Sequence, residues 1–309
     1  MLCDAAGGSS GGASGARPPR SRSVFRPGLL AGKAAIVSGG GTGIGLAVTR
    51  ELLELGCNVL ICSRSAAKLD AAVAMLRRVK LAGEVHAHAC NIRREDEVIT
   101  LVETAVRVLG RIDFLVNNGG GQFVSPAEDI SGKGFRAVVE TNLVGTFLMC
   151  REVYRQWMSQ HGGAIVNVTM VTENGLPRMS HSGAARAGVT NLTRSLATEW
   201  ASSGVRINCV APGIIFTQSG FANYGAMGET MVESITPALP MKRLGTAEEV
   251  SAAVTFLLVE GSAYTSGSTI PVDGGLSTVG YPYPLADTGD KCNFPIFGDA
   301  SVLPPKAKL

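Results

Sequence analysis

The chain has 309 residues, and charged residues make up 17% of it with a formal net charge of +3. That small excess gives no strong electrostatic attraction to nucleic acid or membrane surfaces. Its apolar runs are all shorter than the roughly 20 residues that a membrane-spanning helix needs. The seven cysteines are an odd number without metal-ligand spacing, which indicates buried free thiols in a reducing compartment rather than disulfides.

The N-terminal segment differs in composition from the rest of the chain. Residues 1–26 are rich in Gly, Ser, Ala and Arg and carry one acidic residue, Asp4, so we expect a disordered extension. A Ser- and Arg-rich start also suggests a mitochondrial transit peptide. A clear amphipathic pattern is missing, however, and we therefore favour the disordered extension.

Strands and helices alternate from residue 27 onward, which predicts one α/β domain over residues 27–276. We expect a doubly wound, parallel sheet of the Rossmann type. The last segment, residues 277–309, contains several prolines and is expected to be an extended tail. The predicted strands are residues 34–38, 58–62, 84–89, 112–117, 163–169, 205–210 and 268–272, and the predicted helices are residues 43–56, 66–78, 94–109, 133–160, 182–203 and 246–258.

A glycine-rich turn joins the first predicted strand to the first predicted helix. An apolar run ends at Ser38, glycines follow at once, and helical periodicity begins near Leu46. Glycines permit positive φ, and a helix N-terminus offers unpaired N–H groups to a pyrophosphate. This order of strand, turn and helix predicts a dinucleotide site, with contacts from Gly39, Thr42, Gly43, Ile44 and Gly45.

The end of the second strand indicates which dinucleotide binds. NAD sites usually place a carboxylate about 20 residues beyond the glycines, whereas an arginine there accommodates a 2′-phosphate. This strand ends in Ser63-Arg64 and has no carboxylate. Ser63 and Arg64 therefore predict NADP(H) as the cofactor, although a surface arginine would give the same sequence.

Two further strand ends supply candidate cofactor contacts, because ligands of open α/β sheets bind at the carboxyl ends of the strands. Asn91-Ile92 follows the third strand, and Asn91 is a candidate partner for the adenine. Asn118-Gly119-Gly120 follows the fourth strand, where glycines let the chain pass close to a ribose.

Several motifs together resemble the short-chain dehydrogenases/reductases over residues 32–276. They are Ser38-Gly39-x-x-x-Gly43-Ile44-Gly45, Asn117-Asn118-Gly119-Gly120, Asn142 within Thr141 to Thr146, Pro212-Gly213-x-x-x-Thr217, and Val272-Asp273-Gly274-Gly275. The resemblance implies a seven-stranded sheet, a homotetramer formed through the fourth and fifth helices, and cofactor contacts from Pro212, Gly213, Ile215 and Thr217.

Two stretches narrow the resemblance to a group within that family. Asn117 to Pro126 and His181 to Val189 are similar to the peroxisomal trans-2-enoyl-CoA reductases. This implies an enoyl-CoA substrate and a role in peroxisomal fatty acid metabolism.

The usual catalytic set of the family is Asn, Ser, Tyr and Lys, and this chain departs from it. Asn142 matches the first member, and Thr169-Met170 stands where the Ser is expected. The pattern Arg186-Ala187-Gly188 aligns with the Lys-Ala-Gly of the family, which places Ser182 at the Tyr and Arg186 at the Lys. The resemblance thus implies a catalytic set of Asn142, Thr169, Ser182 and Arg186, with Arg186 also contacting the nicotinamide ribose.

These replacements should impair ketone reduction more than reduction of a conjugated C=C bond. Ketone reduction needs an acid that protonates the forming alkoxide. Neither a serine hydroxyl nor an arginine is an effective acid near neutral pH. Reduction of a C=C bond conjugated to a thioester needs donors that stabilise an oxyanion, and the α-carbon can take its proton from water. We therefore favour enoyl-CoA reduction over alcohol–ketone exchange.

Two alternatives remain open at this stage. A 2,4-dienoyl-CoA reductase shares the replacement of Tyr by Ser, although that group keeps the Lys. A catalytically silent NADPH-binding protein would also explain both losses. The second Tyr-x-x-x-Lys that some enoyl reductases carry further along the helix is absent as well, because those positions are Thr190 and Arg194.

The segment between Thr217 and Arg243 predicts a mobile apolar lid over the substrate, with core packing as the alternative. Within it, Tyr224 is a candidate donor, and Lys242 and Arg243 are candidate contacts for CoA phosphates. His181, next to Ser182, is a candidate proton relay or a structural histidine.

The chain ends in Ala307-Lys308-Leu309, which follows the pattern of Ser-Lys-Leu peroxisomal signals. It predicts a peroxisomal location and an import receptor as a partner.

Overall fold

The structure is a computed structural model that describes residues 23–173, 175–222, 232, 234–279 and 296–298. Its centre is a seven-stranded sheet in the order β3-β2-β1-β4-β5-β6-β7, and every neighbouring pair is parallel. The predicted doubly wound parallel sheet is therefore confirmed. The strands are β1 (Ala34–Ser38), β2 (Asn58–Ser63), β3 (Val85–Ala89), β4 (Phe114–Asn117), β5 (Gly163–Val168), β6 (Val205–Pro212) and β7 (Thr269–Val272).

Strand burial follows position in the sheet. Every residue of β1 and β4 is buried, because both strands lie inside the sheet with helices on both faces. Strand β3 lies at the edge of the described sheet, where it pairs with β2. After the buried Val85, its residues alternate between half-buried histidines and exposed alanines. The order of strands reverses direction between β1 and β4, and this is the point where open α/β sheets bind ligands.

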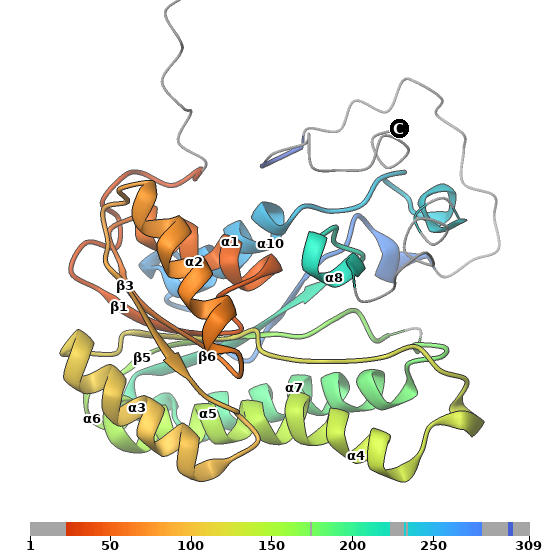
Figure 1. Ribbon diagram of the computed structural model, residues 1–309, viewed down its shortest axis with the longest axis horizontal. Coiled ribbons are helices and arrows are strands. Elements are labelled where there is room, and N and C mark those ends of the chain that lie inside the picture. Colours follow the sequence, from red (N-terminus) through yellow and green to blue (C-terminus); the bar gives the residue numbers. More distant parts are fainter. Residues whose placement is uncertain (1–22, 174, 223–231, 233, 280–295, 299–309) are drawn as a thin grey trace, which may run out of the picture.

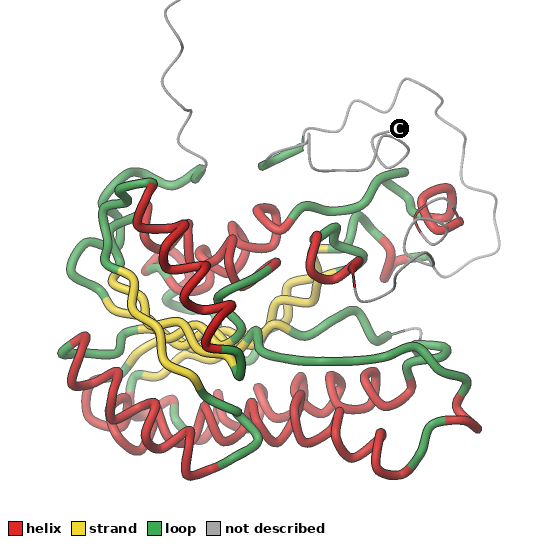
Figure 2. Tube along the Cα trace, viewed as in Figure 1, coloured by secondary structure: helices red, strands yellow, loops and turns green. Residues whose placement is uncertain are grey.

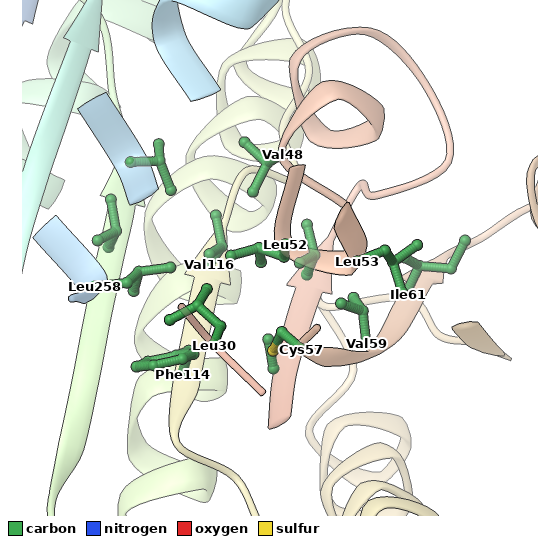
Figure 3. Packing of buried hydrophobic residues seen from close by; sticks show 14 of the residues in the cluster. Leu30, Val48, Leu52, Leu53, Cys57, Val59, Ile61, Phe114, Val116 and Leu258 are labelled. Atoms are coloured by element: carbon green, nitrogen blue, oxygen red, sulfur yellow. The ribbon is translucent and has the colours of Figure 1, made fainter. Parts of the chain in front are cut away.

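Helices cover both faces of the sheet (Figures 1 and 2). One layer contains α1 (Gly43–Glu54), α2 (Ala66–Arg78) and α10 (Ala247–Leu258), and the other contains α3 (Glu95–Leu109), α5 (Gly145–Val153) and α7 (Ser180–Glu199). The first layer is seen from close by in Figure 3, where Val48 and Leu52 of α1 pack near Val116 of β4. These apolar faces bury the core of one domain.

The predicted single helix over residues 133–160 is interrupted. It consists of α4 (Gly132–Val139), α5 and α6 (Ser159–His161), separated by π-helical turns at Glu140–Val144 and Tyr154–Met158. A π turn inserts one residue into the helical ladder and often marks a functional site. Periodicity alone could not predict it, because the apolar stripe continues across the turn. After β6, α8 (Gln218–Ala222) begins the segment that was predicted as a lid.

The described part begins inside the predicted N-terminal extension. The Ser23 hydroxyl donates to Glu51 of α1, and Phe25 packs against the core. Residues 1–22 lie outside the described residues, as does the predicted signal Ala307-Lys308-Leu309. Within the described ranges, no helix is both long and apolar enough to cross a bilayer.

The five cysteines in the described part are free and buried, as predicted. Burial raises the pKa of the Cys150 thiol to about 12, so it is protonated at neutral pH. These thiols therefore pack as small apolar side chains. Cys3 and Cys292 lie outside the described residues.

Candidate active site

The glycine turn after β1 has the shape of an anion cradle. Gly39 and Gly43 adopt φ values of +67° and +53°, and a Cβ on Gly45 would lie 2.2 Å from the Gly39 carbonyl oxygen. The residue before α1, Thr42, makes no side-chain capping hydrogen bond. The turn thus presents the backbone N–H groups of the α1 N-terminus, which fit a pyrophosphate.

The end of β4 is hydrogen-bonded to this turn. The Ser38 hydroxyl oxygen accepts hydrogen bonds from the backbone N–H groups of Asn118 at 3.2 Å and Gly119 at 3.0 Å. The Asn118 side-chain amide donates to the carbonyls of Ser38 and Gly39, both at 3.3 Å. Ile92 lies there too, because a Cβ on Gly119 would be 3.3 Å from Cδ1 of Ile92. Four predicted cofactor positions, Gly39, Ile92, Asn118 and Gly119, thus meet where the strand order reverses.

The loop after β6 reaches the same turn. A Cβ on Gly43 would lie 3.4 Å from Cγ2 of Thr217, so this predicted cofactor residue contacts the turn directly. Ile215 forms an isolated parallel bridge with Gly245. Gly213, just after Pro212, packs so closely on Asp273 that a Cβ would lie 2.8 Å from the Asp273 Cα.

The residues predicted to select the cofactor lie at the ends of β2 and β3. Ser63 is half-buried and Arg64 is exposed. Ser65 caps α2 by accepting a hydrogen bond from the Lys68 N–H at 3.4 Å. Asn91 is held in its turn, because its backbone N–H donates to Glu97 at 2.7 Å. An exposed arginine beside a helix N-terminus is a favourable setting for a phosphate.

Asn142 fixes the loop that follows β4. It lies in the π turn between α4 and α5 and is fully buried. Its side chain makes two hydrogen bonds with the backbone of Gly121, donating to the carbonyl at 3.0 Å and accepting from the N–H at 2.9 Å. In this structure Asn142 therefore holds the loop after β4 in position through Gly121.

Ser182 is fully buried near the start of α7, and its partner is a residue that the sequence did not single out. The Ser182 hydroxyl donates to Oε1 of Gln122 at 2.9 Å and lies 3.8 Å from Sδ of Met170. Gln122 itself is exposed. Its place directly after the glycine run 119–121 was the only signal in the sequence.

Of the pair at the expected Ser position, Met170 contacts Ser182 and Thr169 faces β6. The Thr169 hydroxyl donates to the Val210 carbonyl at 3.2 Å, and the residue is almost completely buried. The Thr169 hydroxyl proton is therefore engaged in a hydrogen bond to the neighbouring strand β6. Sequence alone could not decide between the two neighbours, because consecutive side chains of an extended chain point to opposite sides.

Arg186 lies one helical turn after Ser182, on the same face of α7. Its Nη1 donates to the Val168 carbonyl at 2.5 Å, and a Cβ on Gly120 would lie 2.2 Å from its Nη2. Burial lowers the pKa of the guanidinium to about 10, so it remains positively charged at neutral pH. A fixed cation therefore lies beside the glycines that follow β4.

Comparison with known proteins agrees with this geometry. Residues 39–277 match the protein family described as enoyl-(acyl carrier protein) reductase. A peroxisomal 2,4-dienoyl-CoA reductase from Danio rerio is 34% identical over 255 residues, covering 82% of this chain and 84% of the relative. The chain belongs to the short-chain dehydrogenase/reductase family. It is therefore an oxidoreductase whose Rossmann fold binds a nicotinamide cofactor.

Solved structures of a dehydrogenase and a ketoreductase are similar to the chain. A citronellol catabolism dehydrogenase from Pseudomonas aeruginosa PAO1 is 44% identical, with a TM-score of 0.73 and coverage of 83% of this chain and all of that one. An actinorhodin polyketide ketoreductase determined with NADPH is 28% identical with a TM-score of 0.75, covering 79% of this chain and 97% of that one. The fold is thus shared by proteins whose names describe different substrates.

The remaining candidate site residues of this short-chain dehydrogenase/reductase either lie outside the described residues or contact other protein groups. Tyr224 lies outside the described residues. Arg243 is ion-paired with Glu249 at 2.6 Å, and Nζ of Lys242 donates to the Pro237 carbonyl at 2.6 Å, so both have partners within the protein. The fully buried His181 packs edge-on against Phe123, with ring centroids 4.3 Å apart. The ring contact is that of a packing side chain, whereas both buried ring nitrogens of His181 lack a hydrogen-bond partner among the described residues.

Proposed function

We propose that this chain uses NADPH to reduce the conjugated C=C bond of a trans-2-enoyl-CoA, giving the saturated acyl-CoA. The observation that carries the proposal is the pairing of Ser182 with Gln122 one helical turn from the Arg186 cation. This arrangement offers hydrogen-bond donors and positive charge, but no group that is acidic near neutral pH.

The residues present fit the cofactor. The cradle of Gly39 and Gly45 leaves no space for a Cβ, and the α1 N-terminus faces it without a side-chain cap. The exposed Arg64 would hold the 2′-phosphate of NADPH, and Arg186 would contact the nicotinamide ribose. When bound, the reduced nicotinamide supplies a hydride to the β-carbon.

The protein groups would act on the thioester. Negative charge develops on the thioester oxygen as the β-carbon is reduced, and the fixed cation of Arg186 stabilises that charge in a partly buried site. The neighbouring donor is the Ser182 hydroxyl, which donates to Gln122 Oε1 in this structure and would turn to the thioester oxygen when the substrate binds. Because no acid adjoins the α-carbon among these groups, its proton comes from water.

A second candidate substrate is a 2,4-dienoyl-CoA. The relative from Danio rerio carries that activity in its name. A dienoyl thioester develops charge on the same oxygen, so the same donors would serve. A third candidate is an NADPH-binding protein without turnover, because the resemblance places Ser182 and Arg186 where the family has Tyr and Lys.

The location and assembly complete the proposal. Ala307-Lys308-Leu309 would bring the enzyme to the peroxisome through an import receptor, where it would act in fatty acid metabolism. By resemblance to its family, the enzyme would assemble as a homotetramer.

Absorbance of reduced nicotinamide tests the reaction directly. Purified protein is mixed with NADPH and a medium-length trans-2-enoyl-CoA, a 2,4-dienoyl-CoA or a 3-ketoacyl-CoA in separate assays. The proposal expects the fastest oxidation with the trans-2-enoyl-CoA and little with the 3-ketoacyl-CoA or with NADH. Faster oxidation with the dienoyl-CoA would favour the second candidate, and NADPH binding without turnover would favour the silent protein.

A further inference from the structure

The loop after β4 is attached to the segment that starts α7 by three contacts. They are the Gln122–Ser182 hydrogen bond, the Phe123–His181 ring contact, and the hydrogen bond from the Ser125 N–H to the Arg178 carbonyl at 2.9 Å. We call residues 122–125 the donor loop. Its first residue pairs with Ser182, so the contacts that fix this loop also fix that pair.

The middle contact is made by two rings. His181 is fully buried, and its ring meets Phe123 edge-on, with centroids 4.3 Å apart and planes at 65°. Phe123 also lies against α4, where a Cβ on Gly134 would be 3.1 Å from Cζ of the phenyl ring. Because Gly134 has no side chain, Phe123 fits between α4 and α7, which lie side by side (Figure 1). The ring of His181 thus forms one wall of the place that Phe123 occupies.

The ring nitrogens of His181 do not explain its position. Both are buried, and neither has a hydrogen-bond partner among the residues that the structure describes. A proton relay needs a partner within hydrogen-bond reach, about 2.6–3.2 Å, so this arrangement favours the ring contact over a relay. Burial of polar atoms without partners costs free energy, and a phenyl ring could make the same contact without that cost.

Neighbouring positions in the chain link the ring contact to the donor pair. Phe123 follows Gln122, and His181 precedes Ser182, so the two contacts join the same two segments one residue apart. Consecutive Cα atoms are about 3.8 Å apart, and a displaced Phe123 would therefore move the backbone of Gln122 with it. The 2.9 Å bond between Gln122 and Ser182 tolerates little displacement, because such bonds weaken beyond about 3.2 Å.

The cofactor side of the loop is separated from such a displacement. Asn142 binds both backbone groups of Gly121, with hydrogen bonds of 2.9 and 3.0 Å. Gly121 stands between the predicted cofactor contacts at 118–120 and the donor loop. Loss of the His181 contact should therefore disturb residues 122–125 and leave in place the residues that contact the glycine turn.

We infer that His181 is a positioning residue, whose ring holds Phe123 and thereby keeps Gln122 in hydrogen-bond contact with Ser182. In this role His181 exchanges no proton with the substrate. Its effect on turnover rests on the proposed function, whereas its effect on the donor loop does not.

Four full-length variants test this role. His181→Ala and Phe123→Ala each remove one side of the ring contact, and the second changes a side chain that is 40% exposed, which the fold should tolerate. His181→Phe keeps a flat ring and removes both nitrogens. His161→Ala is the matched control, because the exposed His161 also packs on a ring, that of Trp157, with centroids 4.0 Å apart. His161 precedes β5, at the edge of the sheet opposite to the donor loop.

Amide hydrogen exchange of the substrate-free proteins, resolved by NMR, reports the position of the loop. The Ser125 N–H is bonded to the Arg178 carbonyl, and the Gly121 N–H is bonded to Asn142. In the two alanine variants of the ring contact, the Ser125 N–H should exchange about tenfold faster relative to that of Gly121. In the phenylalanine variant and the control this ratio should stay at the parent value. Equal acceleration of both amides would indicate general destabilisation and overturn the local role.

Kinetics show whether the loop acts through Gln122. In both alanine variants kcat for the trans-2-enoyl-CoA should fall about tenfold, as for Gln122→Ala, while the NADPH Kd stays within about twofold. The double variant Gln122→Ala, His181→Ala should be no slower than Gln122→Ala, because the two changes affect the same donor pair. His181→Phe should keep the parent kcat within about twofold.

Two outcomes would overturn the role. One is a His181→Phe protein that keeps the parent exchange at Ser125 and is as slow as His181→Ala, which would show that a ring nitrogen takes part in the reaction. The other is a further loss of kcat in the double variant, which would show that His181 acts independently of Gln122. The double variant also decides the question if the phenyl ring is too large for the site.

Failure of the proposed function gives a different pattern. If the parent protein turns over no enoyl-CoA, the reaction is wrong, but hydrogen exchange at Ser125 still decides whether His181 holds the donor loop. The two hypotheses can therefore fail separately.

Discussion

Ser182 on α7 and Gln122 in the loop after β4 form a hydroxyl–amide pair, with the Ser182 Oγ donating to Gln122 Oε1 over 2.9 Å. The hydroxyl is fully buried, whereas the glutamine is exposed. The resemblance to the family predicts that Ser182 stands at the position of the catalytic tyrosine. The loop that supplies Gln122 is held one residue earlier, where Asn142 bonds both backbone groups of Gly121.

Removal of either member of the pair should have the same effect as removal of both. Ser182→Ala and Gln122→Ala are each expected to lower kcat about tenfold, because the two groups act as one donor unit. The double variant should be no slower than the slower single variant. NADPH affinity should stay near the parent value in all three proteins, as fluorescence titration would show. Multiplicative losses in the double variant would contradict the coupling.

Two glycines of the cofactor turn offer a matched comparison. A Cβ on Gly45 would lie 2.2 Å from the Gly39 carbonyl oxygen, whereas a Cβ on Gly41 would have its nearest neighbour at 3.6 Å. Gly45→Ala should lower the free energy of unfolding by about 1–3 kcal/mol and abolish tight NADPH binding. Gly41→Ala should stay close to the parent in stability. Equal effects in urea unfolding would show that the crowding at Gly45 is unimportant.

Arg64 should decide between the two nicotinamide dinucleotides. In Arg64→Ser the Kd for NADPH is expected to rise about tenfold or more, while the Kd for NADH stays nearly unchanged, because only NADPH carries the 2′-phosphate. Arg78→Ser removes another exposed arginine and serves as the control. Calorimetric titration with both cofactors measures the difference. A parallel loss of NADH affinity would mean that Arg64 supports the fold of the site instead.

Glu51 gives a prediction about pH. This carboxyl is buried in α1, and burial raises its pKa above the ordinary value of 4.5, although hydroxyls of Ser251, Ser23 and Thr255 donate to it. The folded protein then keeps a proton that the unfolded chain releases. The stability contributed by this group is fully present below pH 4.5 and is lost as pH rises to the raised pKa.

Glu51→Gln removes that titration and keeps the hydrogen-bonding shape. The difference in unfolding free energy between the parent protein and Glu51→Gln should therefore shift in favour of the variant as pH rises from about 4.5 toward neutrality. The exposed Glu128→Gln is the control, and its difference from the parent should vary less. Urea unfolding at several pH values measures both. A pH-independent difference for Glu51→Gln would exclude the burial effect.

Local patterns carried most of the fold prediction. The apolar run before Gly39 and the periodic helix after it are visible within about twenty residues of sequence. The ends of neighbouring strands show the same order of apolar residues followed by turn residues. The predicted strand and helix positions agree closely with the observed ones, because hydrophobic periodicity and turn residues are both properties of neighbouring residues. The interruption of the helix 133–160 was missed, since the π turn that carries Asn142 serves a contact with Gly121, which is distant in sequence.

The sequence by itself determined the family and the parallel sheet, and it predicted the cofactor turn and the replacement of Tyr and Lys by Ser182 and Arg186. These depend on residue types at fixed spacings. Only the tertiary structure decided that Gln122 pairs with Ser182, that Met170 rather than Thr169 contacts it, and that Phe123 packs on His181. Each of these contacts joins residues that are far apart along the chain or chooses between two neighbours. Such contacts depend on how the strands and helices pack against one another, and the local spacing of residues does not predict that packing.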